Sequence, residues 1–112
     1  MLVSQVYDRD QQLEAALERV SSLEEDFEKA CVGYAESESE YRVQFARAYL
    51  AAEGTEKARN SEAIIKVERF LRERDRTEAV KEFTREKLRD SQAAVSARQT
   101  LLKANLDTNK AF

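Results

Sequence analysis

The side chains of this 112-residue chain that could do chemistry are its lysines and arginines, which could bind phosphate groups. Lys81, Arg85 and Arg89 stand four residues apart and would share one face of a helix. A basic stripe on a helix can follow a nucleic-acid backbone. The other candidate nucleic-acid-binding residues precede this group in the second half of the chain: Lys57, Arg59, Lys66, Arg69, Arg72 and Arg76.

Acidic residues alternate with some of these bases and support a different interpretation. Glu78, Glu82 and Glu86 each stand three residues before a base, a spacing that allows ion pairs within one helix. Such pairs would explain the bases at 81–89 without any ligand, whereas the bases at 66–76 have less obvious partners. Base-stacking aromatic residues are scarce in this half. They are Phe70, Phe83 and Phe112, the first two placed on the apolar face.

Catalytic groups are largely missing. The chain has no histidine and a single cysteine, Cys31, which excludes imidazole bases, Cys-His pairs and cysteine-cluster metal sites. Glycine-rich phosphate loops are absent, and the carboxylate runs "LEEDFE" and "ESESE" are typical of solvated helix faces. We therefore expect no enzyme, no cofactor, no metal and no small-molecule substrate.

The first half carries a seven-residue apolar repeat at Val6, Leu13, Val20, Phe27, Tyr34, Tyr41 and Ala48. A companion register contains Val3, Asp10, Leu17, Glu24, Cys31, Glu38, Phe45 and Ala52. This repeat is typical of one long helix with a coiled-coil seam. The core and oligomer seam is expected at Val6, Leu13, Leu17, Val20, Phe27, Tyr34, Tyr41 and Phe45.

Every second companion position is acidic: Asp10, Glu24 and Glu38. A carboxylate in a dry seam is costly unless it has a partner. Either these side chains meet Arg or Lys from another helix, or the seam is open to water there. Gly33 interrupts the same helix, either at a kink or close helix contact or as a tolerated surface residue.

A turn is expected at residues 54–55. Gly54 suits the left-handed position after a helix, and Thr55 suits an N-cap with Glu56 in the first turn. So short a connection predicts one domain over 1–112, an antiparallel helical hairpin of two helices of about 50 residues. Helix one is expected over about 3–53, helix two over about 56–106, and a frayed tail over 107–112.

The second helix is less regular than the first. Its apolar clusters are centred on residues 64–71, 80–88 and 95–106, and the segment "RERDRTE" at 72–78 separates the first two. The second cluster contains Val80, Phe83 and Leu88. Helix two could break near Asp75, but neither Gly nor Pro interrupts it, and we favour continuity.

Composition agrees with an all-α, coiled-coil-like fold, since charged residues make up 37% and proline is absent. No run of apolar residues is long enough to span a membrane.

Residues 1–53 hold 12 acidic and 5 basic side chains, whereas residues 54–112 hold 10 acidic and 14 basic ones. Two antiparallel helices of opposite sign would attract each other. Alternatively, the basic half faces a polyanion.

The segment "YRVQFARAYLAAEGTEKAR" resembles a pattern found in small all-helical proteins of tailed phages, often among recombination and replication functions. The matching residues are Tyr41, Ala46, Ala48, Tyr49, Leu50, Ala52, Gly54, Thr55 and Arg59. Residues 88–106, "LRDSQAAVSARQTLLKANL", resemble the C-terminal helix of these proteins. The characterised type is the UvsY-like recombination mediator, a helical oligomer. The resemblance implies binding to single-stranded DNA through basic side chains, and help in loading a recombinase.

Two functions are therefore open. The first is a phage accessory protein of DNA recombination or replication that binds single-stranded DNA and a recombinase or another protein as a homo-oligomer. The alternative is a structural or protein-binding coiled-coil module, a scaffold or an inhibitor of a host complex, with no nucleic-acid binding. A lone cysteine fits a cytoplasmic location, the host bacterial cytoplasm if the chain is phage-encoded.

Overall fold

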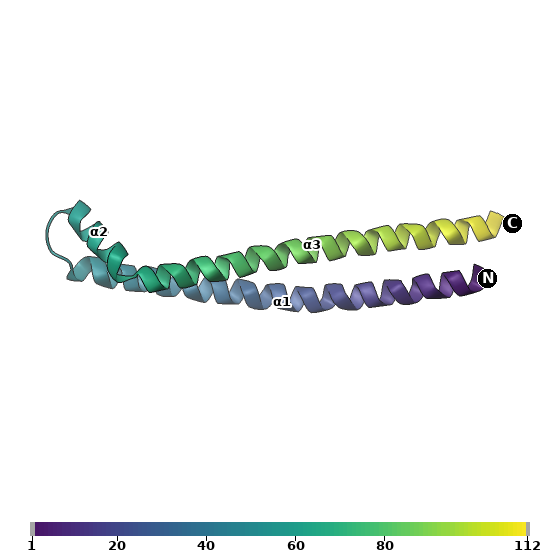
Figure 1. Ribbon diagram of the computed structural model, residues 1–112, viewed down its shortest axis with the longest axis horizontal. Coiled ribbons are helices and arrows are strands. Elements are labelled where there is room, and N and C mark those ends of the chain that lie inside the picture. Colours follow the sequence, from purple (N-terminus) through teal and green to yellow (C-terminus); the bar gives the residue numbers. More distant parts are fainter. Residues whose placement is uncertain (1, 112) are drawn as a thin grey trace. The chain divides into compact units, whose positions relative to one another are not determined.

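The structure is a computed structural model that describes residues 2–111, with side-chain exposure for residues 8–108. Three helices follow one another: α1 (Leu2–Ala51), α2 (Glu56–Lys66) and α3 (Glu68–Ala111) (Figure 1). The predicted all-α hairpin is confirmed. The chain divides into two compact units. Unit 1 joins residues up to 27 to residues from 84 onward, and unit 2 comprises residues 28–83.

The turn of the hairpin lies in unit 2 and follows the expected local chemistry. Gly54 has a φ of 105°, the left-handed region that favours glycine. The Thr55 hydroxyl accepts a hydrogen bond from the Ala58 N–H at 3.2 Å and so caps the first turn of α2. Ala52, 4% exposed, anchors the end of α1. The predicted turn residues therefore form the connection between the antiparallel helices.

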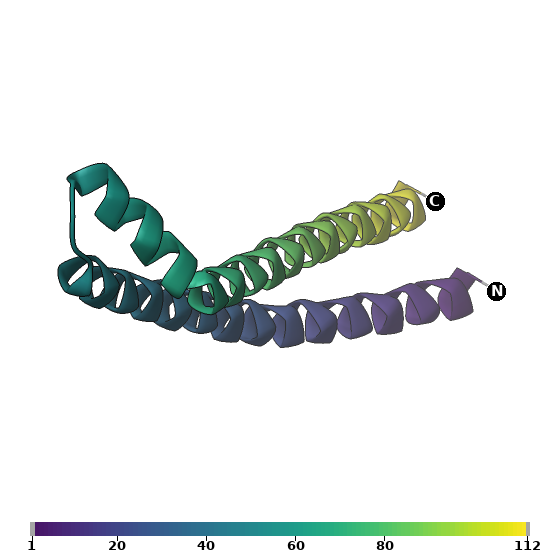
Figure 2. The same cartoon turned by 60° about the vertical axis from the view of Figure 1, so that its left-hand side comes forward.

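The predicted second helix is two helices, which separate at Val67 (Figures 1 and 2). Val67 has φ −103° and ψ 15°, and its side chain is 3% exposed. Ile64, Ile65 and Val67 are β-branched, which lowers helix propensity at this point without any Gly or Pro. The alternative break near Asp75 does not occur, and α3 continues through 72–78 and past the expected end at 106 to Ala111.

In unit 1 the first half of α1 and the second half of α3 run side by side in opposite directions (Figure 1). Leu23 and Val95 are the most buried apolar side chains of this unit, each 8% exposed. Half-buried neighbours along the same faces complete a narrow core: Leu13, Val20, Phe27, Leu88 and Leu102. Only small stripes of each helix are therefore withdrawn from water.

The companion register of α1 departs from the prediction only in the first half of the helix, since Cys31, Glu38 and Phe45 are half-buried and Ala52 is buried. Leu17 is 46% exposed, and Asp10 and Glu24 are exposed. Ala16 and Leu23 turn inward in their place, whereas farther along α1 Ala30, Ser37 and Gln44 are half-buried beside the companion residues. Val6 of the predicted seam lies outside the residues whose side chains are described. The change of register leaves these two carboxylates in water, where they escape the cost of desolvation.

Two further predictions about α1 are resolved. Glu38 is half-buried, and it pairs with Arg42 of its own helix at 2.8 Å instead of with another helix. α1 runs through Gly33 without a break, and a Cβ placed there would meet nothing within 4 Å. Gly33 is therefore a tolerated helical glycine and makes no close helix contact.

Candidate functional site

Basic side chains of α3 lie over aromatic rings of α1 in the seam between the two helices. In unit 2 the Arg74 guanidinium carbon is 4.7 Å from the centre of the Tyr41 ring. In the same unit, Lys81 Nζ is 4.2 Å from the centre of the Tyr34 ring. In unit 1 Arg85 lies over Phe27 at 5.8 Å. A cation over an aromatic face is attracted by the ring quadrupole. These bases therefore serve the contact between helices.

Their position follows from a seven-residue repeat that begins at Val67 and continues along α3. Val67, Arg74, Lys81, Leu88 and Val95 are seven residues apart, and each is buried or half-buried. The Arg74 and Lys81 side chains are only 29% and 19% exposed. Long basic side chains can bury their aliphatic stems while the charged group reaches a polar or aromatic partner. The middle of the seam is thus filled by bases where an apolar side chain would be usual.

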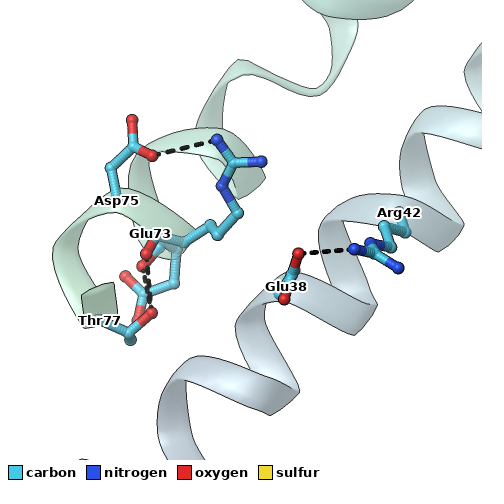
Figure 3. A network of polar contacts seen from close by, with 6 residues as sticks. Glu38, Arg42, Glu73, Asp75 and Thr77 are labelled. Atoms are coloured by element: carbon cyan, nitrogen blue, oxygen red, sulfur yellow. Dashed lines mark hydrogen bonds and ion pairs between the residues drawn. The ribbon is translucent and has the colours of Figure 1, made fainter. Parts of the chain in front are cut away.

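Polar residues continue along the same face of α3. Thr77 is 9% exposed and Thr84 is 8% exposed. The Thr77 hydroxyl donates to the backbone carbonyls of Glu73 and Arg74, at 3.1 and 2.9 Å (Figure 3). Arg74 donates to Asp75 at 3.4 Å, and its Nε is buried without a hydrogen-bond partner. This face of α3 is therefore polar at Arg74, Thr77 and Lys81 in unit 2, and at Thr84, the first residue of α3 in unit 1.

Three of the bases expected to have less obvious partners are paired within their own helix. Lys66 Nζ is 3.2 Å from Glu62. Arg72 lies 2.6 Å from Glu68. Arg76 donates twice to Glu73, at 2.6 and 3.0 Å. The expectation that the bases at 66–76 are less paired than those at 81–89 is wrong for these three, because carboxylates stand three or four residues before each of them.

The Arg76–Glu73 pair shifts both ionisations. Two hydrogen bonds from Arg76 stabilise the carboxylate, so the pKa of Glu73 lies below its usual range. The same bonds raise the pKa of Arg76. Both side chains remain exposed, at 64% and 51%, so water screens this pair and it contributes little to stability.

The remaining predicted bases are scattered. Arg69 lies over the Phe70 ring at 4.6 Å, and Arg89 is 3.9 Å from Glu86 as expected. Lys57 is exposed and Arg59 half-buried near the turn. The nine residues therefore do not form one site. Arg69, Arg72 and Arg76 do share the exposed side of α3 in unit 2, and we call them the basic stripe.

Large apolar side chains lie on the outside of unit 2, which sequence patterning did not indicate. Phe83 and Val80 were expected in an apolar cluster with Leu88, but they are 62% and 44% exposed. The seam positions nearby are taken by bases and threonines. The other large apolar residues exposed in this unit are Val32, Val43, Leu50, Ile64 and Ile65.

The described residues offer a single thiol and neither a metal site nor a membrane-spanning helix. Cys31 is half-buried and carries a free thiol. Within the described part of the chain, no three side chains of the ligating types gather where they could hold a metal ion. Over the same residues, no helix combines the length and apolarity needed to cross a membrane.

Comparison with known proteins adds no identification. No family model, no curated protein and no solved structure matches the chain.

Proposed function

We propose that this chain is a protein-binding helical hairpin, a structural or scaffold-type module whose partner contributes a helix. The supporting observation is the outer face of α1 in unit 2, formed by Val32, Val43 and Leu50. These side chains are 53%, 43% and 78% exposed. Exposed apolar residues that line up on one face favour contact with another protein more than scattered ones do.

The three residues fall on one line. They are spaced by eleven and seven residues, which at about 100° per residue keeps them within roughly 20° of one another around the helix. Val43 lies two residues from Tyr41, so the line is about 160° away from the seam. The hairpin's own packing therefore does not use this face. An amphipathic partner helix recognises such spacing with its apolar side.

Burial of this face supplies a usable driving force. Full burial of a Val or Leu side chain is worth about 1.5–3 kcal/mol, and three such side chains stand in line. The loss of translational and rotational freedom on association offsets part of this free energy. A partner that also covers Ile65, which is 74% exposed near the turn, would add to it. The outer face therefore suits a specific but moderate contact.

Site-specific photo-crosslinking in the native cells tests the proposal. A benzophenone amino acid replaces Val43 or Leu50, and a control variant carries it at Arg42, whose side chain is 75% exposed and lies off this line. We expect a discrete protein adduct from the first two positions and not from the control. The absence of adducts, or the same adducts from all three positions, would contradict the proposal.

Single-stranded nucleic acid is the second candidate ligand, and one observation favours it. Phe83, 62% exposed, lies seven residues beyond Arg76 and so on the same side of α3 as the basic stripe. Arginines beside an exposed aromatic ring are the combination that holds phosphates and stacks bases. The ion pairs of Arg72 and Arg76 are exposed and weak, so a phosphate could compete with Glu68 and Glu73. In this role the chain would act as a phage recombination or replication accessory protein, as the resemblance implies.

Fluorescence anisotropy with a labelled single strand, and a matched duplex as control, tests this second function. The logarithm of the binding constant falls linearly with the logarithm of the salt concentration. Replacing Arg69, Arg72 and Arg76 together by Ala should make this slope shallower by about two units. The matched control replaces three exposed bases of α1, Lys29, Arg42 and Arg47, for the same change in net charge. No binding at low salt, or equal effects of both triple changes, would exclude the basic stripe as the site.

A further inference from the structure

We propose that unit 1 carries a self-assembly site, in which the exposed Leu17 of one copy enters a groove between α1 and α3 of a second copy. The groove has a volume of about 660 Å³. Its small apolar lining is Ala15 and Ala16 of α1 and Ala94 of α3. Small side chains allow a third helix to approach both helices closely.

The rim of the groove is mostly basic. Arg19, Lys87 and Arg98 line it against one acidic residue, Asp90. The Arg98 guanidinium donates to Gln12 Oε1 at 3.1 Å, a bond that joins α3 to α1 at the groove. Ser91 is the remaining lining residue, and it is uncharged. An occupant with an apolar side chain set among carboxylates would match both the lining and the rim.

α1 of the same chain offers such an occupant. Leu17 is 46% exposed. Asp10, Glu14 and Glu24 are exposed and stand seven, three and seven residues from Leu17, spacings that place them on the same side of the helix. We call this surface the acidic knob. Residues 8–27 as a whole hold seven acidic and two basic side chains, whereas residues 84–108 hold five basic and three acidic ones.

One copy cannot fill its own groove. Ala15 and Arg19 of the groove are each two residues from Leu17, so they lie about 160° around α1 from the knob. For the same reason, two copies cannot insert into each other at once. The contact is therefore heterologous, with the knob of each copy in the groove of the next. Repeated contacts of this kind close into a ring or continue as a filament.

Two variants separate the two halves of the contact. Leu17→Ser removes the apolar side chain at the centre of the acidic knob. Ala94→Leu fills the groove from an exposed position of α3. Neither residue belongs to the buried core, so circular dichroism should show unchanged helix content. Leu106→Ser is the matched control, because Leu106 is 44% exposed and does not line the groove. Glu14→Lys is a second knob variant that tests the charges alone.

Light scattering behind size exclusion, run over a range of concentrations, gives the masses. We expect the wild type and Leu106→Ser to grow beyond a dimer as concentration rises, and more weakly at high salt. Leu17→Ser and Ala94→Leu should each weaken association by roughly ten- to a hundredfold, the equivalent of burying one leucine. Glu14→Lys should weaken it at low salt.

Mixing the two variants gives the decisive result. Leu17→Ser keeps an open groove and Ala94→Leu keeps its knob, so one contact remains possible between them. The mixture should form a complex of two chains that grows no further. The proposal is overturned if the wild type stays monomeric, if either variant assembles like the wild type, or if the mixture stays monomeric.

Discussion

The contact between Lys81 and Tyr34 predicts a measurable coupling energy between two residues far apart in sequence. The perturbation is a double-mutant cycle of Lys81→Met and Tyr34→Leu. Methionine keeps the length and helix propensity of lysine and removes the ammonium, and leucine removes the aromatic face. Any energy that depends on both groups then appears as non-additivity in the free energy of unfolding.

The structure sets the expected magnitude. Nζ lies 4.2 Å from the ring centre, and the Lys81 side chain is 19% exposed. Cation–π contacts contribute about 0.5–1 kcal/mol at exposed sites and about 2 kcal/mol when desolvated. A contact that is mostly but not fully withdrawn from water should therefore give a coupling of about 1 kcal/mol.

Urea unfolding followed by circular dichroism at one fixed protein concentration measures the four variants. The control cycle pairs Lys81→Met with Tyr41→Leu. Tyr41 is one heptad away, about 10 Å along α1, so that pair should be additive within about 0.5 kcal/mol. If the Lys81–Tyr34 coupling is no larger than that of the control pair, the reasoning about the seam is wrong.

Four further outcomes follow from individual residues or pairs of residues. Gly33→Ala should raise the free energy of unfolding by about 1 kcal/mol, since a Cβ meets nothing there. Gly54→Ala, at φ 105°, should lower it by about 1–3 kcal/mol, and thermal or urea unfolding checks both. Leu23→Ala should cost about 2 kcal/mol, whereas Leu50→Ala should stay within about 0.5 kcal/mol, because their exposures are 8% and 78%. In a carboxyl NMR titration, Glu73 should ionise below the usual range of a glutamate, and Arg76→Ala should move its pKa upward. Because the folded pKa is the lower one, the contribution of this pair is present at neutral pH and is lost as pH falls through that pKa.

The turn was predictable because local chemistry decides it. One register of α1 was predictable because its apolar residues recur every seven positions. Gly54 and Thr55 have a backbone conformation and a hydroxyl bond that few residues supply. The break at Val67 was not predictable in this way, because no Gly or Pro marks it. It depends on β-branched residues, whose effect is small enough for packing to override.

The inner and outer faces were the hardest to predict. Ala16 and Gln44 turn inward but carry no hydrophobic signal, whereas Leu17 does and stays largely outside. Arg74 and Lys81 look like solvent residues by type, and only their spacing from Val67 reveals their place. Hydrophobicity likewise predicted burial of Phe83, whose side chain is 62% exposed. A hairpin of two helices has too little interior to hold every apolar residue.

Bases fill the seam of unit 2, and large apolar side chains stay outside it. Hydroxyl-radical footprinting of dilute protein, in the Leu17→Ser background to limit association, tests this arrangement most directly. We expect Leu50, Ile65 and Phe83 to be oxidised much faster, relative to their intrinsic reactivity, than Leu23 and Val95. Protection of Leu50 and Phe83 to the level of Leu23 in that dilute sample would contradict it.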